Sequence, residues 1–215
     1  MMPRAVLADR ANGRGAKRVP LSALGRVRGG YVAPSSHTEA DSSPLLGLQP
    51  SDVAPDGTIR WTSLRPVQPV RDGVRYEVRE GDVLLPLRST RLVAVVARDV
   101  PAEVIAVGHW LIISLDPSRA TPEFLAWYLN HPTTTQRLRT LSKGSSLQFL
   151  PLSGLRDFEV EVPPWQTQDR IVRVMSLHRR ITELEQQIAH TRQQLVDAIA
   201  LEALRITPSS PTPTF

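Results

Sequence analysis

The sequence predicts an α+β fold, in which a mixed, mostly antiparallel sheet and several helices form one domain and a long C-terminal helix follows. Three observations predict it. Strand-like apolar runs separated by turn signals occupy residues 82–115, and two helical segments with start signals follow over 121–144. Residues 166–205 then contain neither glycine nor proline, and their apolar residues recur with a heptad period.

The expected strands are short apolar runs rich in β-branched residues. Four of them lie at residues 82–87, 92–100, 104–107 and 111–115. A fifth is expected at 155–162, where Phe158, Val160 and Val162 alternate with acidic residues. Because this alternation has the two-residue period of a strand, these three side chains should face the core.

Two helices are expected between these strands. Thr121 can cap the first helix, Pro122 suits its first position, and Glu123 complements the positive end of the helix dipole. Pro132 opens the second helix, and Gly144 supplies a C-terminal stop. The two helices should therefore be consecutive and separated by a short turn.

The long helix has an apolar seam. With Val174 at heptad position a, the seam continues through Leu177, Ile181, Leu184, Ile188 and Leu195. A single helix of this length, roughly 60 Å at 1.5 Å per residue, needs a partner for such a seam. We expect a coiled coil with another chain or a second copy, the alternative being a helix that folds back on its own domain.

Charge and composition exclude several classes of protein. The chain has 26 Lys and Arg against 21 Asp and Glu, a net charge of +5 that favours a polyanionic partner. It has no cysteine, which excludes disulfides and thiolate metal sites. No apolar run is long enough to span a membrane, so we expect a cytoplasmic protein with no membrane partner. Two windows that lack acidic residues, 83–98 and 124–156, gather cations that can face phosphates; ordinary solvated surface is the alternative.

No catalytic or cofactor site is recognisable. Gly81-Asp82 lacks the second carboxylate and the lysine of a nuclease, which favours a role in a turn. Val162-Pro163-Pro164-Trp165 resembles an amino-methyltransferase motif, but valine cannot accept the hydrogen bond of a target amine. The five histidines have no metal-ligand spacing, and no glycine-rich cofactor loop follows a strand. We therefore expect a protein that is not an enzyme and holds no cofactor and no metal.

Short motifs follow one another in a distinctive order along the chain. They are Val19-Pro20-Leu21 with Gly29-Gly30, Glu80-Gly81-Asp82-Val83-Leu84-Leu85, Ile112-Ile113-Ser114-Leu115, Thr121-Pro122-Glu123-Phe124-Leu125, Lys143-Gly144-Ser145-Ser146, and Val162-Pro163-Pro164 followed by Gln168, Arg170 and Ile171. This progression resembles the repeating half of type I restriction-modification specificity subunits, from about residue 19 to 204. Full-length members carry two recognition domains and two spacer helices, whereas this chain has one of each, so it resembles a half-size subunit.

Composition, which predicts the two tails, and the resemblance, which implies the parts between them, together divide the chain into four parts. They are a basic flexible tail at 1–19, a DNA target-recognition domain at 20–165, a spacer and dimerisation helix at 166–205, and a disordered tail at 206–215. The resemblance also implies phage defence as the setting, with double-stranded DNA, a DNA methyltransferase subunit and, as a further option, a restriction-translocase subunit as partners. A homodimer, or pairing with another half-subunit, would complete a two-part recognition site, and a self-paired dimer would read inverted half-sites.

The candidate DNA contacts lie in the two cationic windows. Arginine, lysine, serine and backbone amides bind phosphates, while arginine and glutamine also read base edges. The candidates are Arg88, Ser89, Arg91, Arg137, Arg139, Lys143, Gly144, Ser145, Ser146 and Gln148. Two alternatives remain open: a regulator or inhibitor that binds a methyltransferase through its helix without reading DNA, and a nuclease or methyltransferase with an unrecognised site.

Overall fold

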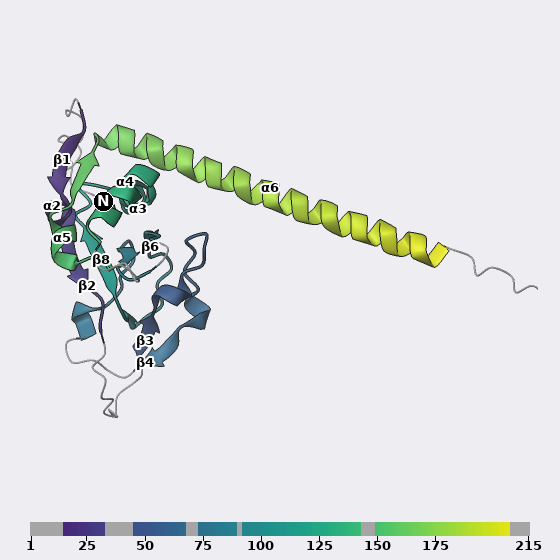
Figure 1. Ribbon diagram of the computed structural model, residues 1–215, viewed down its shortest axis with the longest axis horizontal. Helices are drawn as coiled ribbons and strands as arrows, with labels where there is room; N and C mark the ends of the chain where they lie inside the picture. The colour runs from purple at the N-terminus through teal and green to yellow at the C-terminus, as the bar shows by residue number, and fades with distance from the viewer. Residues whose placement is uncertain (1–14, 33–44, 68–72, 90–91, 143–148, 207–215) are drawn as a thin grey trace, which may run out of the picture. The chain divides into compact units, whose positions relative to one another are not determined.

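The computed structural model describes residues 15–32, 45–67, 73–89, 92–142 and 149–206 (Figure 1). The chain divides into two compact units after Val172. The first unit holds every strand that the structure describes, together with the short helices and the first turns of the long helix. The second unit contains the remainder of the long helix.

A four-stranded antiparallel sheet is the centre of the first unit. Its order is β2 (Gly25–Gly29), β8 (Trp110–Leu115), β5 (Val83–Pro86) and β6 (Val95–Val96). Ile113 of β8 lies opposite Val27 on one side and Val83 on the other. The predicted strands at 82–87, 104–107 and 111–115 are thus confirmed within a residue or two at their ends.

Two smaller sheets complete the strands. A three-stranded sheet has β3 (Leu45–Leu48) at its centre, antiparallel to β4 (Arg65–Val67) and parallel to β7 (Val104–Ala106). A two-stranded ribbon pairs β1 (Lys17–Pro20) with β9 (Glu159–Val162), with Val19 opposite Val160. The ribbon therefore joins the start of the first unit to the segment that leads into the long helix.

The helices begin as the sequence predicts. They are α2 (Leu21–Leu24), α3 (Pro122–Asn130), α4 (Pro132–Thr140), α5 (Leu152–Arg156) and α6 (Trp165–Ile206), with single 3-10 turns at Pro50–Asp52, Trp61–Ser63 and Gly73–Arg75. Thr121 caps α3, since its hydroxyl accepts a hydrogen bond of 3.2 Å from the backbone N–H of Phe124. Helix α4 ends at Thr140, before the predicted stop at Gly144, which lies outside the described residues.

The central sheet separates two apolar clusters. Successive side chains of a strand point to opposite faces, so β8 contributes to both clusters. Leu111 and Ile113 pack with apolar side chains of α2, α3, α4 and α5, whereas Trp110 and Ile112 pack with those of β3 and β7. The first unit is therefore an α+β fold whose main sheet is buried on both faces, and the predicted fold class is confirmed.

Two expected strands are shorter than predicted. The strand expected at 92–100 is reduced to β6, because the side chain of Asn130 takes the place of a strand partner: it accepts a hydrogen bond from Ala94 N–H and donates one to Ala94 C=O, both 2.7 Å long. The strand expected at 155–162 begins at Glu159, because Leu155 lies on α5 and is buried there. Phe158 and Val160 are buried as expected.

Candidate nucleic-acid interface

The first candidate DNA contact, Arg88, lies just beyond the end of β5. Leu87 N–H donates to His109 C=O over 2.7 Å, and Leu87 C=O accepts from Leu150 N–H over 2.9 Å. Arg88 itself forms an antiparallel bridge with Phe149, and its side chain is exposed. The exit of β5 is thereby held beside a segment that lies some sixty positions further along the chain.

Phe149 anchors this second segment. Its ring packs against His109, with centroids 5.5 Å apart and the rings inclined at 76°, and it also contacts the apolar cluster under the helices. Phe149 directly follows residues 143–148, and Ser89 directly precedes residues 90–91, in the sequence. The remaining candidates there, Arg91, Lys143, Gly144, Ser145, Ser146 and Gln148, lie outside the described residues. The structure thus brings together one segment from each of the two cationic windows, which the sequence could only treat separately.

The two candidate arginines of α4 have different surroundings. Arg137 donates from Nη1 to the hydroxyl of Tyr128 and from Nη2 to the carbonyl of Glu159, each over 3.0 Å, and its guanidinium lies 4.7 Å from the centre of the Phe158 ring. These contacts attach α4 to β9 and give Arg137 a role inside the fold. Arg139 is exposed. That Arg137 and Arg139 contact DNA stays a prediction.

Other arginines in the two windows also form ion pairs or hydrogen bonds within the fold. Arg98 forms ion pairs with Glu80, at 3.2 Å, and with Glu123. Arg156 donates to the carbonyl of Val27 over 3.3 Å. Of the candidate DNA contacts that the structure describes, Arg88 and Arg139 are the two with exposed side chains.

A buried ion pair lies within the first unit. Arg28 Nη2 is 2.7 Å from Asp82 Oδ2, and both side chains are almost completely buried. The other carboxylate oxygen of Asp82 accepts from Ser114 Oγ over 2.6 Å, and Arg79 N–H donates to Oδ2 over 3.0 Å. Burial lowers the pKa of the Arg28 guanidinium, and the charge of Asp82 opposes that shift.

This pair was missed by the sequence reasoning. Gly81 has φ of 81°, which confirms the turn expected at Gly81-Asp82. The turn does not explain the buried carboxylate, whose partner is 54 residues away in the chain. An acidic residue at the start of an apolar strand was the available signal, because a buried charge requires a partner of opposite sign. Both carboxylate oxygens of Asp82 accept hydrogen bonds, and Nη1 and Nη2 of Arg28 donate them, whereas the buried Nε has no partner among the described residues. Loss of either side chain would leave the charge of the other buried and unpaired.

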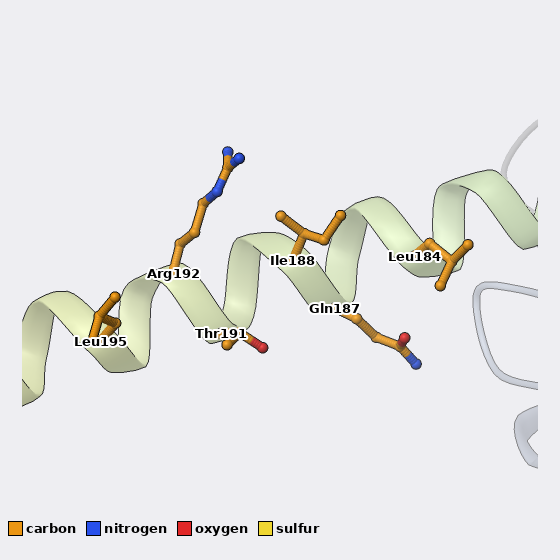
Figure 2. Close-up of a pocket in the computed structure, with 6 residues that line it drawn as sticks. All are labelled: Leu184, Gln187, Ile188, Thr191, Arg192 and Leu195. Atoms are coloured by element: carbon orange, nitrogen blue, oxygen red, sulfur yellow. The ribbon is translucent and has the colours of Figure 1, made fainter.

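The predicted seam of α6 is exposed in the second unit. All six seam residues are exposed, from 41% for Leu184 to 64% for Leu177. A surface hollow lies along this part of the helix. Figure 2 shows the six side chains that line it: Leu184, Gln187, Ile188, Thr191, Arg192 and Leu195. Further apolar residues towards the end of the helix, Val196, Ile199 and Leu201, are also exposed. The second unit therefore carries a long exposed apolar stripe.

The described residues contain neither a candidate metal centre nor a candidate membrane span. Within the described ranges, no group of three histidine or acidic side chains could hold a metal ion. Of the helices that the structure describes, none is long and apolar enough to cross a membrane.

The first unit and its helix together have the architecture of known specificity subunits. The HsdS subunit from Thermoanaerobacter tengcongensis superposes with a TM-score of 0.63 at 18% identity over 94% of this chain and 52% of that one. A chain from a study of complex assembly and conformational transition of the type I restriction-modification system gives 0.63 at 20% identity, again over 94% and 52%. The type I S subunit from M. genitalium gives 0.56 at 12% identity, over 92% and 48%. The chain spans about half the length of these solved structures, and the likeness establishes the fold.

The family follows from the sequence itself. The model of the type I restriction modification DNA specificity domain matches residues 75–191, more than half of the chain. The protein therefore belongs to the type I restriction-modification DNA specificity family, and the resemblance found in its motifs is confirmed. A search of curated protein sequences gave no match.

Proposed function

We propose that this chain reads one half-site in double-stranded DNA and docks a DNA methyltransferase subunit through α6, within a restriction-modification system that defends a bacterial cell against phage. The observation that carries this proposal is the position of the family match, which spans both cationic windows and every seam residue except Leu195. The chain itself supplies recognition, and the chemistry belongs to its partner.

The proposed DNA surface is built around the exit of β5. Arg88 and Arg139 supply exposed positive charge, and Ser89 lies beside Arg88. Contacts of arginine with phosphates position a protein on the duplex, while residues of adjoining loops read the bases. The pairing of Arg88 with Phe149 supports a shared surface, because it links the two windows from which those contacts are expected.

Neutralising Arg88 and Arg139 should weaken DNA binding and reduce the dependence of the binding constant on salt concentration. Each phosphate contact releases counterions, so the slope of log K against log salt should fall by about 0.9 for each arginine–phosphate interaction that is removed. We expect the double variant Arg88→Gln/Arg139→Gln to bind duplex DNA more weakly at every sequence, with the slope reduced by about 2. Fluorescence anisotropy titrations at several salt concentrations would measure both effects.

The matched control is Arg119→Gln. Arg119 is also exposed, but it forms an ion pair with Asp116 at 3.4 Å, and its replacement should leave the slope unchanged. An unchanged slope in the double variant would remove Arg88 and Arg139 from the DNA surface. Selection from a randomised DNA pool tests base readout: a shared motif supports it, and its absence, with or without the methyltransferase subunit, would favour a regulator that binds the methyltransferase without reading DNA.

The exposed seam of α6 supports assembly through this helix. A coiled-coil seam stabilises by burying a and d side chains between helices, so a charge at those positions opposes association. We expect Leu184→Glu/Ile188→Glu to abolish self-association, or binding of the modification subunit, at concentrations where the parent chain associates. Sedimentation equilibrium of the chain alone, and of the chain mixed with the modification subunit of the same system, would measure this.

The control places the same charges on another face of the helix. Gln186 and Gln193 occupy the heptad positions opposite the seam and are exposed. The variant Gln186→Glu/Gln193→Glu should associate like the parent chain. Equal association of the seam variant and this control would show that α6 does not dock through its apolar stripe.

A further inference from the structure

Strands β5 and β6 form a hairpin with a first arm, residues 82–89, and a second arm, residues 92–97. The ladder between the arms is short, and its last pair is Leu84 with Val95. Hydrogen bonds to one neighbour recur at every second residue of an antiparallel strand, and Asp82 C=O accepts from Ala97 N–H over 2.8 Å. After Leu84, the next residue that would bond to the second arm is therefore Pro86, which has no N–H. The ladder ends at this proline.

Beyond Pro86, the two arms bind different elements of the first unit. On the first arm, the C=O of Leu87 accepts a hydrogen bond of 2.9 Å from Leu150 N–H. On the second arm, the N–H and the C=O of Ala94 both bond to the side-chain amide of Asn130, the last residue of α3, over 2.7 Å each. Each arm is thus held by a partner of its own.

The bonds of Asn130 matter because Ala94 is only 3% exposed. The amide presents an acceptor and a donor side by side, and a buried main-chain N–H or C=O that loses its partner is costly. Ala94 also packs in the same apolar cluster as Leu87 and Leu150. A shift of the second arm would therefore disturb the contact of the first arm with Leu150.

We propose that Asn130 is a positioning residue for DNA recognition, which holds the second arm on α3 so that the first arm pairs with Phe149 and Leu150. The candidate contacts Arg88 and Ser89 lie on the first arm, so this pairing sets where one cationic window lies against the other. The inference rests on the proposed function, because the position of the windows matters for recognition only if they face DNA. The coupling between the arms can be measured without DNA, which separates the two ideas.

Amide hydrogen exchange, followed by NMR on the full chain without DNA, tests the coupling. Asn130→Ala removes both bonds to Ala94 and introduces a residue that favours helix. We expect exchange at the amides of Ala94 and Leu150 to become about tenfold faster relative to the amide of Ile113. Ile113 lies in the middle of β8 with a strand on each side, so its exchange reports unfolding of the whole sheet.

Two further variants complete this test. Asn130→Asp keeps an acceptor for Ala94 N–H and replaces the donor by a carboxylate oxygen, so its effect should be intermediate. Gln166→Ala removes an exposed side-chain amide of the first unit outside both cationic windows, and it should leave all three exchange rates unchanged.

The relative exchange rates distinguish positioning from plain stabilisation. Equal acceleration at Ala94, Leu150 and Ile113 would show that Asn130 only stabilises the fold, and acceleration at Ala94 alone would show that the arms are independent. Either result would overturn the proposal. If Asn130→Ala does not fold, Asn130→Asp decides by the same criterion.

Binding to DNA tests the consequence for recognition. The ratio of two binding constants, for a motif selected from a randomised pool and for a scrambled duplex, should fall by about tenfold in Asn130→Ala. The salt dependence of binding to the scrambled duplex should stay that of the parent chain, because Arg88 and Arg139 are both retained. An unchanged ratio would overturn the role in recognition. A parent chain that selects no motif, yet loosens at Ala94 and Leu150 together in Asn130→Ala, would contradict the proposed function and leave the coupling of the arms intact.

Discussion

Asp82→Asn should lower the free energy of unfolding by about 3–5 kcal/mol, the largest effect that we expect from a single change of charge. The variant leaves Arg28 buried and charged without its anion, and it also weakens the bonds from Ser114 Oγ and Arg79 N–H. Urea denaturation followed by circular dichroism would measure the loss, with an unchanged m-value indicating that the denatured state is unaffected.

The double variant Arg28→Met/Asp82→Leu provides the matched comparison. Replacing both partners by apolar side chains removes the unpaired charge, so much of the lost stability should return. Asp116→Asn removes a carboxylate from an exposed pair and should cost at most about 1 kcal/mol. A loss in Asp82→Asn no greater than in Asp116→Asn would show that the carboxylate of Asp82 is not needed to offset the buried charge of Arg28.

Gly25→Ala should destabilise the first unit by about 3 kcal/mol or more, because a side chain at this position has no space. A Cβ on Gly25 would overlap the carbonyl oxygen of Ser114 and lie 2.8 Å from Cα of Leu115. Both atoms belong to the backbone of β8, the partner strand in the sheet, and cannot move without separating β2 from β8. Thermal unfolding would show a strongly lowered melting temperature.

Gly29 is the control within the same strand. A Cβ there would lie 3.5 Å from a side-chain carbon of Leu152, an ordinary contact, so Gly29→Ala should change stability little. Equal losses of stability in Gly25→Ala and Gly29→Ala would show that the close approach of the β8 backbone to Gly25 does not cause the loss.

Gly154→Ala should have the opposite effect and stabilise the fold by about 0.5–1 kcal/mol, because Gly154 lies inside α5 and alanine favours helix.

For the candidate site, the sequence could predict the kinds of side chain that take part but not their contacts within the fold. Arg88, Arg139 and the six seam residues are exposed, and the roles inferred for them from charge and period stay predictions. The internal contacts of Arg137 were not visible in the sequence, because Tyr128, Phe158 and Glu159 come together only when α4 packs against β9. Charge patterning shows which side chains are available, and packing decides which of them remain on the surface.

The sequence by itself determined the features that depend on neighbouring residues. Capping at Thr121, prolines at the starts of α3 and α4, and the heptad period of α6 act over one or a few turns, so the pattern suffices to place them. The tertiary structure decided the order of the strands, the replacement of a strand partner by Asn130, and the burial of Arg28 with Asp82. These contacts join residues distant in the chain, and their free energy is gained only after the loops between them have closed.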